Sequence, residues 1–91
     1  MEVREVAKRM KDEGYYLIGI TVIDIGKYFE IIYHFSREKN RKNIRFIVRK
    51  GEKIPTISDI FPNAFLYEWE EYEAFGIKFE NAEKLFGEKS G

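Results

Sequence analysis

The sequence predicts an α+β fold, in which an antiparallel meander sheet of three or more strands is covered on one face by helices. Apolar residues recur at helical spacing near both ends of the chain. Between them lie runs rich in β-branched and aromatic residues, separated by short turn signals. With 91 residues, of which 44% are hydrophobic, the chain is expected to form a single domain over residues 1–91.

The first predicted elements are a helix and a hairpin. Apolar side chains at every third or fourth position predict a helix over Glu2–Glu13, and Gly14 is suited to end it in the left-handed conformation. The run YYLIGITVIDIGKYFEIIYHFS predicts two strands, with Gly26 in the turn between them. The run NIRFIVRK, with isoleucine, phenylalanine and valine alternating with arginine, predicts a third strand at residues 43–50.

Two connections and a second helix complete the prediction. REKNRKN, residues 37–43, is predicted as a charged loop, and GEKIPTISDIFP, residues 51–62, as a turn-rich segment interrupted by its two prolines. A helix is expected from Asn63 to a cap at Gly76. Its core-facing stripe is predicted to consist of three aromatic residues, Phe65, Trp69 and Tyr72. Residues 83–91 are expected to form a short turn or a frayed end.

Several classes of site are excluded by the residue types present. The chain has no cysteine, which excludes disulfides, thiolate metal sites and iron–sulfur ligation by this chain. His34 is the one histidine, and we assign it no role because no catalytic or metal-binding pattern surrounds it. The glycines follow no phosphate-binding pattern. We therefore expect no cofactor, no metal, no catalytic residue and no enzyme activity from this chain alone.

The composition also bears on location. No apolar run approaches the roughly 20 residues that span a bilayer, and the N-terminus lacks the apolar core of a signal peptide. We expect a cytoplasmic protein without direct membrane insertion. Glutamine is absent and Glu, Lys and Ile are abundant, a composition typical of thermophile proteins.

The stretch YEWEEYEAFG, residues 67–76, is the candidate interaction site. Glutamates three residues apart repel each other on a helix, so a second role for them is worth seeking. Glu68 and Glu73 border the predicted aromatic stripe, a position that suits contact with arginines of another surface. The alternative is that the rings are core and that the acids are solvated or paired with Arg45 and Arg49.

A second candidate surface is basic. Residues 37–53 contain eight basic and two acidic residues, which raises nucleic-acid binding by the strand and loop as an alternative function. A solvated strand edge, blunted by its cations, explains the same pattern. The neutral overall charge and the lack of an aromatic RNA-binding motif weigh against nucleic acid.

The segment PTISDIFPNAFLYEWEEYEAFGIKF resembles the signature region of the respiratory-chain NADH dehydrogenase 30 kDa subunit family. That family includes subunits of energy-converting hydrogenases and formate hydrogenlyases. The aromatic-proline pair, the acids and the closing motif fall at Phe61, Pro62, Glu68, Glu70, Glu73, Phe75, Gly76 and Ile77. The chain departs from the family pattern at Trp69, where arginine is usual, and at Asn81 and Ala82, where Gly-His commonly follows.

The resemblance implies a subunit without a redox centre. Such a protein packs on the large catalytic subunit of a complex-I-like NADH dehydrogenase or a membrane-bound nickel–iron hydrogenase, at the cytoplasmic side of the membrane. Its expected partners are that large subunit and neighbouring subunits of the electron-transport complex, and no nucleic acid. The implied partner interface comprises Glu68, Trp69, Glu70, Glu73, Phe75 and Gly76. The resemblance does not select among dehydrogenase, hydrogenase and formate hydrogenlyase.

Overall fold

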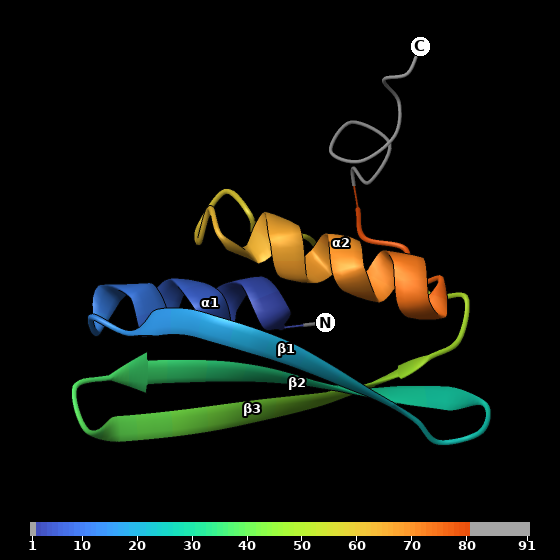
Figure 1. The fold of residues 1–91 in the computed structure, drawn as a ribbon, viewed down its shortest axis with the longest axis horizontal. Helices are drawn as coiled ribbons and strands as arrows, with labels where there is room; N and C mark the ends of the chain where they lie inside the picture. Colours follow the sequence, from blue (N-terminus) through green and yellow to red (C-terminus); the bar gives the residue numbers. More distant parts are fainter. Residues whose placement is uncertain (1, 81–91) are drawn as a thin grey trace, which may run out of the picture.

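The structure, a computed structural model, describes residues 2–80 of the chain. Two helices lie on one face of a three-stranded antiparallel sheet with the order β1-β2-β3, which confirms the predicted α+β architecture (Figure 1). The elements are α1 (Val3–Asp12), β1 (Tyr16–Asp24), β2 (Tyr28–Arg37), β3 (Asn40–Arg49) and α2 (Ala64–Phe75). Neither helix in this part of the chain is long and apolar enough to cross a bilayer.

The first helix and the hairpin follow the sequence pattern closely. α1 buries Val3, Ala7 and Met10 against the sheet, because these positions share one face of the helix. Gly14 follows the helix with φ +85, the left-handed conformation expected there. Gly26, with φ +92, forms the turn between β1 and β2, and its N–H donates a hydrogen bond to Asp24 Oδ1 at 3.1 Å.

The central strand β2 supplies most of the sheet's contribution to the core. Phe29, Ile31, Tyr33 and Phe35 alternate along it and are all buried beneath the helices. The opposite face of the sheet carries the polar side chains of β2, as predicted. Ile32 is the exception in β2, because it is buried on that second face between Thr21 and Arg45 of the flanking strands.

The prediction of a charged loop over residues 37–43 is wrong, because most of this stretch belongs to strands β2 and β3. Strand β2 runs to Arg37 and β3 begins at Asn40, so Glu38 and Lys39 alone form the turn. Backbone pairing with the central strand outweighs the polar composition of this stretch. A cation also contacts an aromatic ring there, because the Arg37 guanidinium lies 4.7 Å from the centre of the Tyr15 ring.

The segment between β3 and α2 is a structural part of the core. Ile54, Ile57 and Phe61 are buried in it, although their surroundings in sequence are turn-forming. Arg4 of α1 holds the segment by donating from Nη1 to the Thr56 carbonyl oxygen at 2.7 Å and by pairing with Asp59 through both guanidinium nitrogens at 2.8 Å. These hydrogen bonds lower the pKa of Asp59 to about 2.

Helix α2 presents a different face to the core from the predicted one. Its buried residues are Ala64 and Glu68, whereas Phe65 and Trp69 are half-buried and Tyr72 is exposed. The predicted aromatic stripe is therefore wrong as a description of the core-facing side. Residues 81–91, including Asn81, Ala82 and the predicted C-terminal turn, lie outside the described residues.

Candidate protein-protein interface

Helix α2 is fixed at both ends. Asn63, at its N-cap, donates a hydrogen bond from Nδ2 to the Leu17 carbonyl oxygen on β1 at 2.8 Å. Gly76 ends the helix with φ +72, and its N–H donates to the Tyr72 carbonyl oxygen at 2.9 Å, which confirms the predicted cap. Fixed ends determine which side chains of α2 face the sheet and which face outward.

Glu68 occupies the centre of the inward face, and 0% of its surface is exposed. Its Oε1 accepts a hydrogen bond from the Thr56 hydroxyl at 2.6 Å, and its Oε2 accepts one from the Ile57 N–H at 2.9 Å. Burial raises the pKa of Glu68 to about 7, although both hydrogen bonds favour the charged form. The carboxyl group therefore changes its protonation state near neutral pH.

A tyrosine hydroxyl lies in the same part of the core. The Tyr33 Oη is the one buried side-chain polar atom in residues 2–80 that lacks a hydrogen-bond partner. Burial raises the pKa of Tyr33, and the charge of Glu68 contributes to that rise. Two polar groups thus share the apolar layer between β2 and α2, and one of them is unsatisfied.

The position of Glu68 changes the predicted interface. We expected it to contact arginines of another surface, but its carboxylate is enclosed within the molecule by Thr56 and Ile57. Counting apolar residues around a helix could not reveal this, because the O–H and N–H donors come from the connecting segment. Glu68 therefore joins α2 to its own fold.

The other predicted interface residues lie on or near the molecular surface. Glu70, Glu73 and Gly76 are exposed, and Trp69 is half-buried with its ring centre 5.8 Å from that of Tyr72. Phe75 is 39% exposed and meets Phe29 edge to face at 5.7 Å. The structure therefore leaves acids and ring surface together on the outer part of α2.

The acids of α2 have no basic partner among the described residues. Every ion pair found in residues 2–80 involves other acids: Asp59, Glu30 and Asp24. Arg45 contacts Glu30 at 3.1 Å, and Arg49 donates to the Tyr28 hydroxyl at 3.3 Å, so neither of the expected partners is joined to α2. Burial, and next the charge of Glu70, raise the pKa of Glu71.

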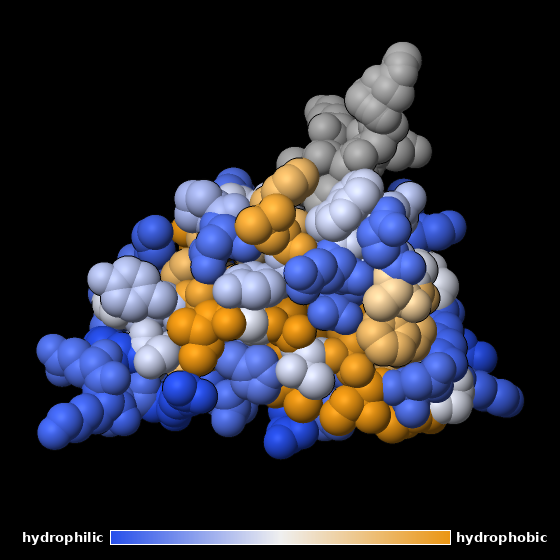
Figure 2. Space-filling view, in the orientation of Figure 1, coloured by the Kyte–Doolittle hydropathy of each residue, from blue (hydrophilic) through white to orange (hydrophobic). Residues whose placement is uncertain are grey.

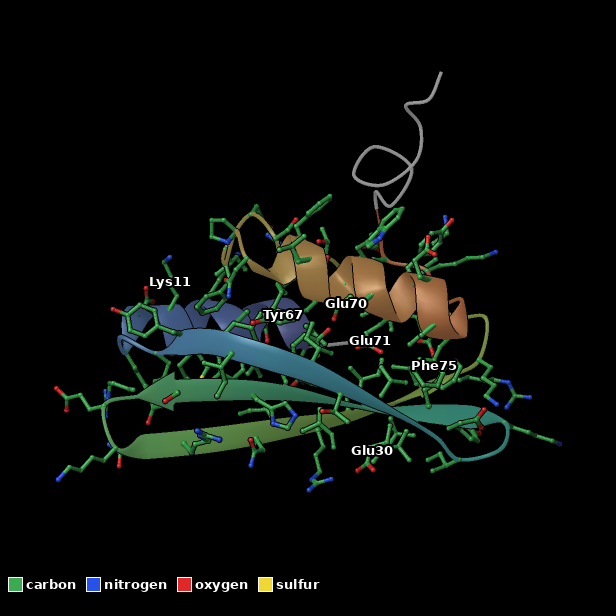
Figure 3. All side chains as sticks on the ribbon, viewed as in Figure 1. Lys11, Glu30, Tyr67, Glu70, Glu71 and Phe75 are labelled. Atoms are coloured by element: carbon green, nitrogen blue, oxygen red, sulfur yellow. The ribbon has the colours of Figure 1, made fainter. Side chains whose placement is uncertain are left out.

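Two features of this surface were missed in the sequence. Glu71 points from α2 toward β1, with Tyr67 and Phe75 on either side and Glu70 nearby (Figure 3). Strand β1, beneath it, is an edge strand of the sheet and carries the exposed side chains of Tyr16, Ile18 and Ile23. The sequence signal was the absence of lysine and arginine from YLIGITVID, since natural edge strands commonly carry such charges.

The basic stretch 37–53 is largely engaged within the fold. Arg45 and Lys50 form ion pairs with Glu30 and Asp24, and Arg37 donates to the Glu13 carbonyl oxygen. His34 bridges neighbouring strands, with its Nε2 2.7 Å from Thr21 Oγ1 and its Nδ1 2.7 Å from Asn43 Oδ1. These contacts give the basic stretch and the histidine structural roles in the sheet.

The fold and surface define a small α+β protein in which acidic and aromatic side chains lie together on the outer part of one helix. Within residues 2–80, no group of three or more histidine, cysteine or acidic side chains is placed to hold a metal ion. Residues 1–86 match the family described as "Respiratory-chain NADH dehydrogenase, 30 Kd subunit". The chain belongs to this family, which confirms the resemblance seen in the sequence.

Individual relatives agree with this assignment. The NADH-quinone oxidoreductase C subunit of Ruegeria pomeroyi is 34% identical over 68 residues, which cover 69% of this chain and 34% of the relative. The C subunit of Jannaschia is 37% identical over 68 residues, which cover 69% of this chain and 33% of that protein. A C/D subunit of the same enzyme from Buchnera aphidicola is 41% identical over 61 residues, 64% of this chain and 10% of the relative. The chain thus spans about a third of the Ruegeria and Jannaschia relatives.

Proposed function

We propose that this chain is a non-catalytic structural subunit of an oxidoreductase complex, either a complex-I-like NADH dehydrogenase or a membrane-bound nickel–iron hydrogenase. It docks on the large catalytic subunit through the outer face of α2. The complex carries electrons, and this subunit holds its parts in position at the inner face of the membrane. Membership of the 30 kDa subunit family and the names of the NADH-quinone oxidoreductase relatives support this proposal.

The observation that supports docking through α2 is that its exposed acids form no ion pair within the described residues. Glu70 and Glu73 are exposed, lie close to ring surface and have no ion pair within the described residues. Carboxylates in such surroundings form strong bidentate hydrogen bonds with arginine when a partner excludes water from them. An arginine-bearing surface of the large subunit would supply those bonds.

The test is a binding measurement with the large subunit. Glu70→Gln combined with Glu73→Gln should weaken the complex by about thirtyfold or more, because removing one side of a buried charge pair costs about 2 to 5 kcal/mol of binding. The melting temperature of the isolated chain should change little, since both side chains are exposed. Calorimetric titration and thermal melts measure the two quantities.

A matched control comes from α1. Glu5→Gln combined with Glu13→Gln removes the same charge from two exposed acids near the other helix and should leave binding within about twofold. Equal weakening by both pairs would mean that overall charge, not the α2 surface, governs binding. Absence of any complex between the wild-type chain and the large subunit would refute the proposed function itself.

A further inference from the structure

The two edges of the sheet differ in how they are protected. Strand β3, at one edge, carries the cations Arg41, Lys42, Arg45 and Arg49. Strand β1, at the other edge, carries no lysine, arginine or proline along its nine residues. An edge strand exposes a row of backbone N–H and C=O groups, and natural proteins usually protect it with such residues or cover it. Apart from a bulge between Leu17 and Gly19, the β1 edge lacks these protections and has the properties of a strand that is covered in use.

The part of β1 able to receive another strand is regular. A bulge interrupts its pairing with β2 between Leu17 and Gly19, and from Gly19 to Asp24 the register continues without a break. Hydrophobic side chains form a band along β1 beneath α2 on this face of the molecule (Figure 2). Ile23, in this regular part, is 41% exposed and lies opposite Glu30, on the face of the sheet away from the helices. Backbone groups and apolar side chains are thus offered together.

Charge indicates what the added strand carries. Glu71 is half-buried between α2 and β1, and no basic side chain in residues 2–80 forms an ion pair with it. Glu70 lies beside it and is exposed (Figure 3). A strand lying along β1 would pass below these two carboxylates, so lysine or arginine side chains on it would be favoured.

The charges of Glu70 and Glu71 disfavour a second copy of this chain as the molecule that pairs with the β1 edge. Pairing of two β1 edges would bring two α2 helices, each with unpaired Glu70 and Glu71, to the same side of the joined sheet. Like charges facing each other across an interface oppose association. A basic segment of a different subunit meets no such repulsion.

We propose that the regular half of β1, Gly19–Asp24, receives an extended basic segment of the partner subunit as a fourth strand, and that Glu70 and Glu71 bind the cations of that segment. Backbone hydrogen bonds supply affinity in strand addition, and side-chain contacts supply specificity. This inference rests on the proposed function, because the occupant belongs to the large subunit.

The decisive experiment compares two substitutions at equivalent positions on the two edges of the sheet. Ile23 on β1 and Ile47 on β3 both lie opposite Glu30 of the central strand, and both are exposed. Ile23→Lys places a cation at the proposed docking edge, and Ile47→Lys places the same cation at the protected edge. We expect Ile23→Lys to weaken binding to the purified large subunit about tenfold or more, and Ile47→Lys less than about twofold.

Hydrogen exchange of the complex identifies the surface directly. Alternate amides of Gly19–Asp24 should exchange at least about tenfold more slowly when the large subunit is bound, while the β3 amides keep their rates. Glu71→Gln should weaken binding without lowering the melting temperature of the isolated chain.

Other results would overturn the strand addition. A complex that forms with unchanged β1 exchange, or that tolerates Ile23→Lys, would remove this inference and leave the α2 docking proposal intact. Protection of β1 in the isolated chain, together with a dimer in light scattering, would show that a second copy is the occupant.

Discussion

At the residue scale, Glu68 joins α2 to the connecting segment while its carboxyl group is fully removed from water. Two hydrogen bonds to a carboxylate stabilise its charged form, and burial disfavours it. The raised pKa shows that burial has the larger effect. The protonated form avoids most of that penalty and still has oxygen atoms for the same donors.

The stability of the protein should therefore fall as the pH rises from about 4.5 to about 7. In this range the folded state holds the Glu68 proton and the unfolded state has released it, so raising the pH favours unfolding. The shift from 4.5 to about 7 corresponds to a decrease of about 3 kcal/mol in the free energy of unfolding. Denaturant unfolding at several pH values measures it.

Glu68→Gln isolates this contribution. Its amide oxygen can accept from the Ile57 N–H, and its amide N–H can donate to Thr56 Oγ1, so the shape and bonding of the site are retained. We expect the variant to lack most of the decrease between pH 4.5 and 7. Parallel curves for the variant and the wild type would show that another group causes the pH dependence.

At the scale of the element, α2 shows what the sequence could and could not predict. Its end at Gly76 follows from capping chemistry, which is local. Asn63, at its start, makes no side-chain cap hydrogen bond and instead donates to the Leu17 carbonyl oxygen on β1. Its inward face depends on Thr56 and Ile57, which become neighbours only in the folded chain. A helix with rings and acids on several sides therefore has an ambiguous pattern until its surroundings are known.

The cap of α2 gives a prediction about stability. Gly76→Val should lower the free energy of unfolding by about 1 to 3 kcal/mol, because a β-branched residue resists the left-handed conformation at φ +72. A Cβ at this position meets no atom within 4 Å, so the backbone conformation alone would cause the loss. Thermal unfolding should show a decrease of at least about 4 °C.

Asparagine provides the comparison at this position. Gly76→Asn should retain more stability than Gly76→Val, because asparagine enters the left-handed region more readily. Equal melting temperatures for glycine, asparagine and valine would contradict the role of φ at this cap.

At the scale of the molecule, the order of elements and the covered face of the sheet were predictable because they follow from hydrophobic periodicity. The first part of β3, residues 40–43, was not predictable from the sequence, because its residues are polar and only its pairing with β2 makes it a strand. The role of the acids and rings of α2 as an interaction surface remains a prediction. The proposed contribution of β1 could not be inferred from the sequence, because an edge strand is identified only when the strand order is known.

The unequal edges of the sheet also bear on stoichiometry. A chain with two accepting edges can add neighbours on both sides of its sheet, whereas a chain whose second edge carries the cations of β3 would accept a strand only along β1. Growth of this kind terminates after one step. We expect one copy of this chain per large subunit, without filaments at high concentration, and analytical ultracentrifugation of the complex measures that ratio. An unprotected edge on one side and a charged edge on the other would make this protein an end piece of its assembly.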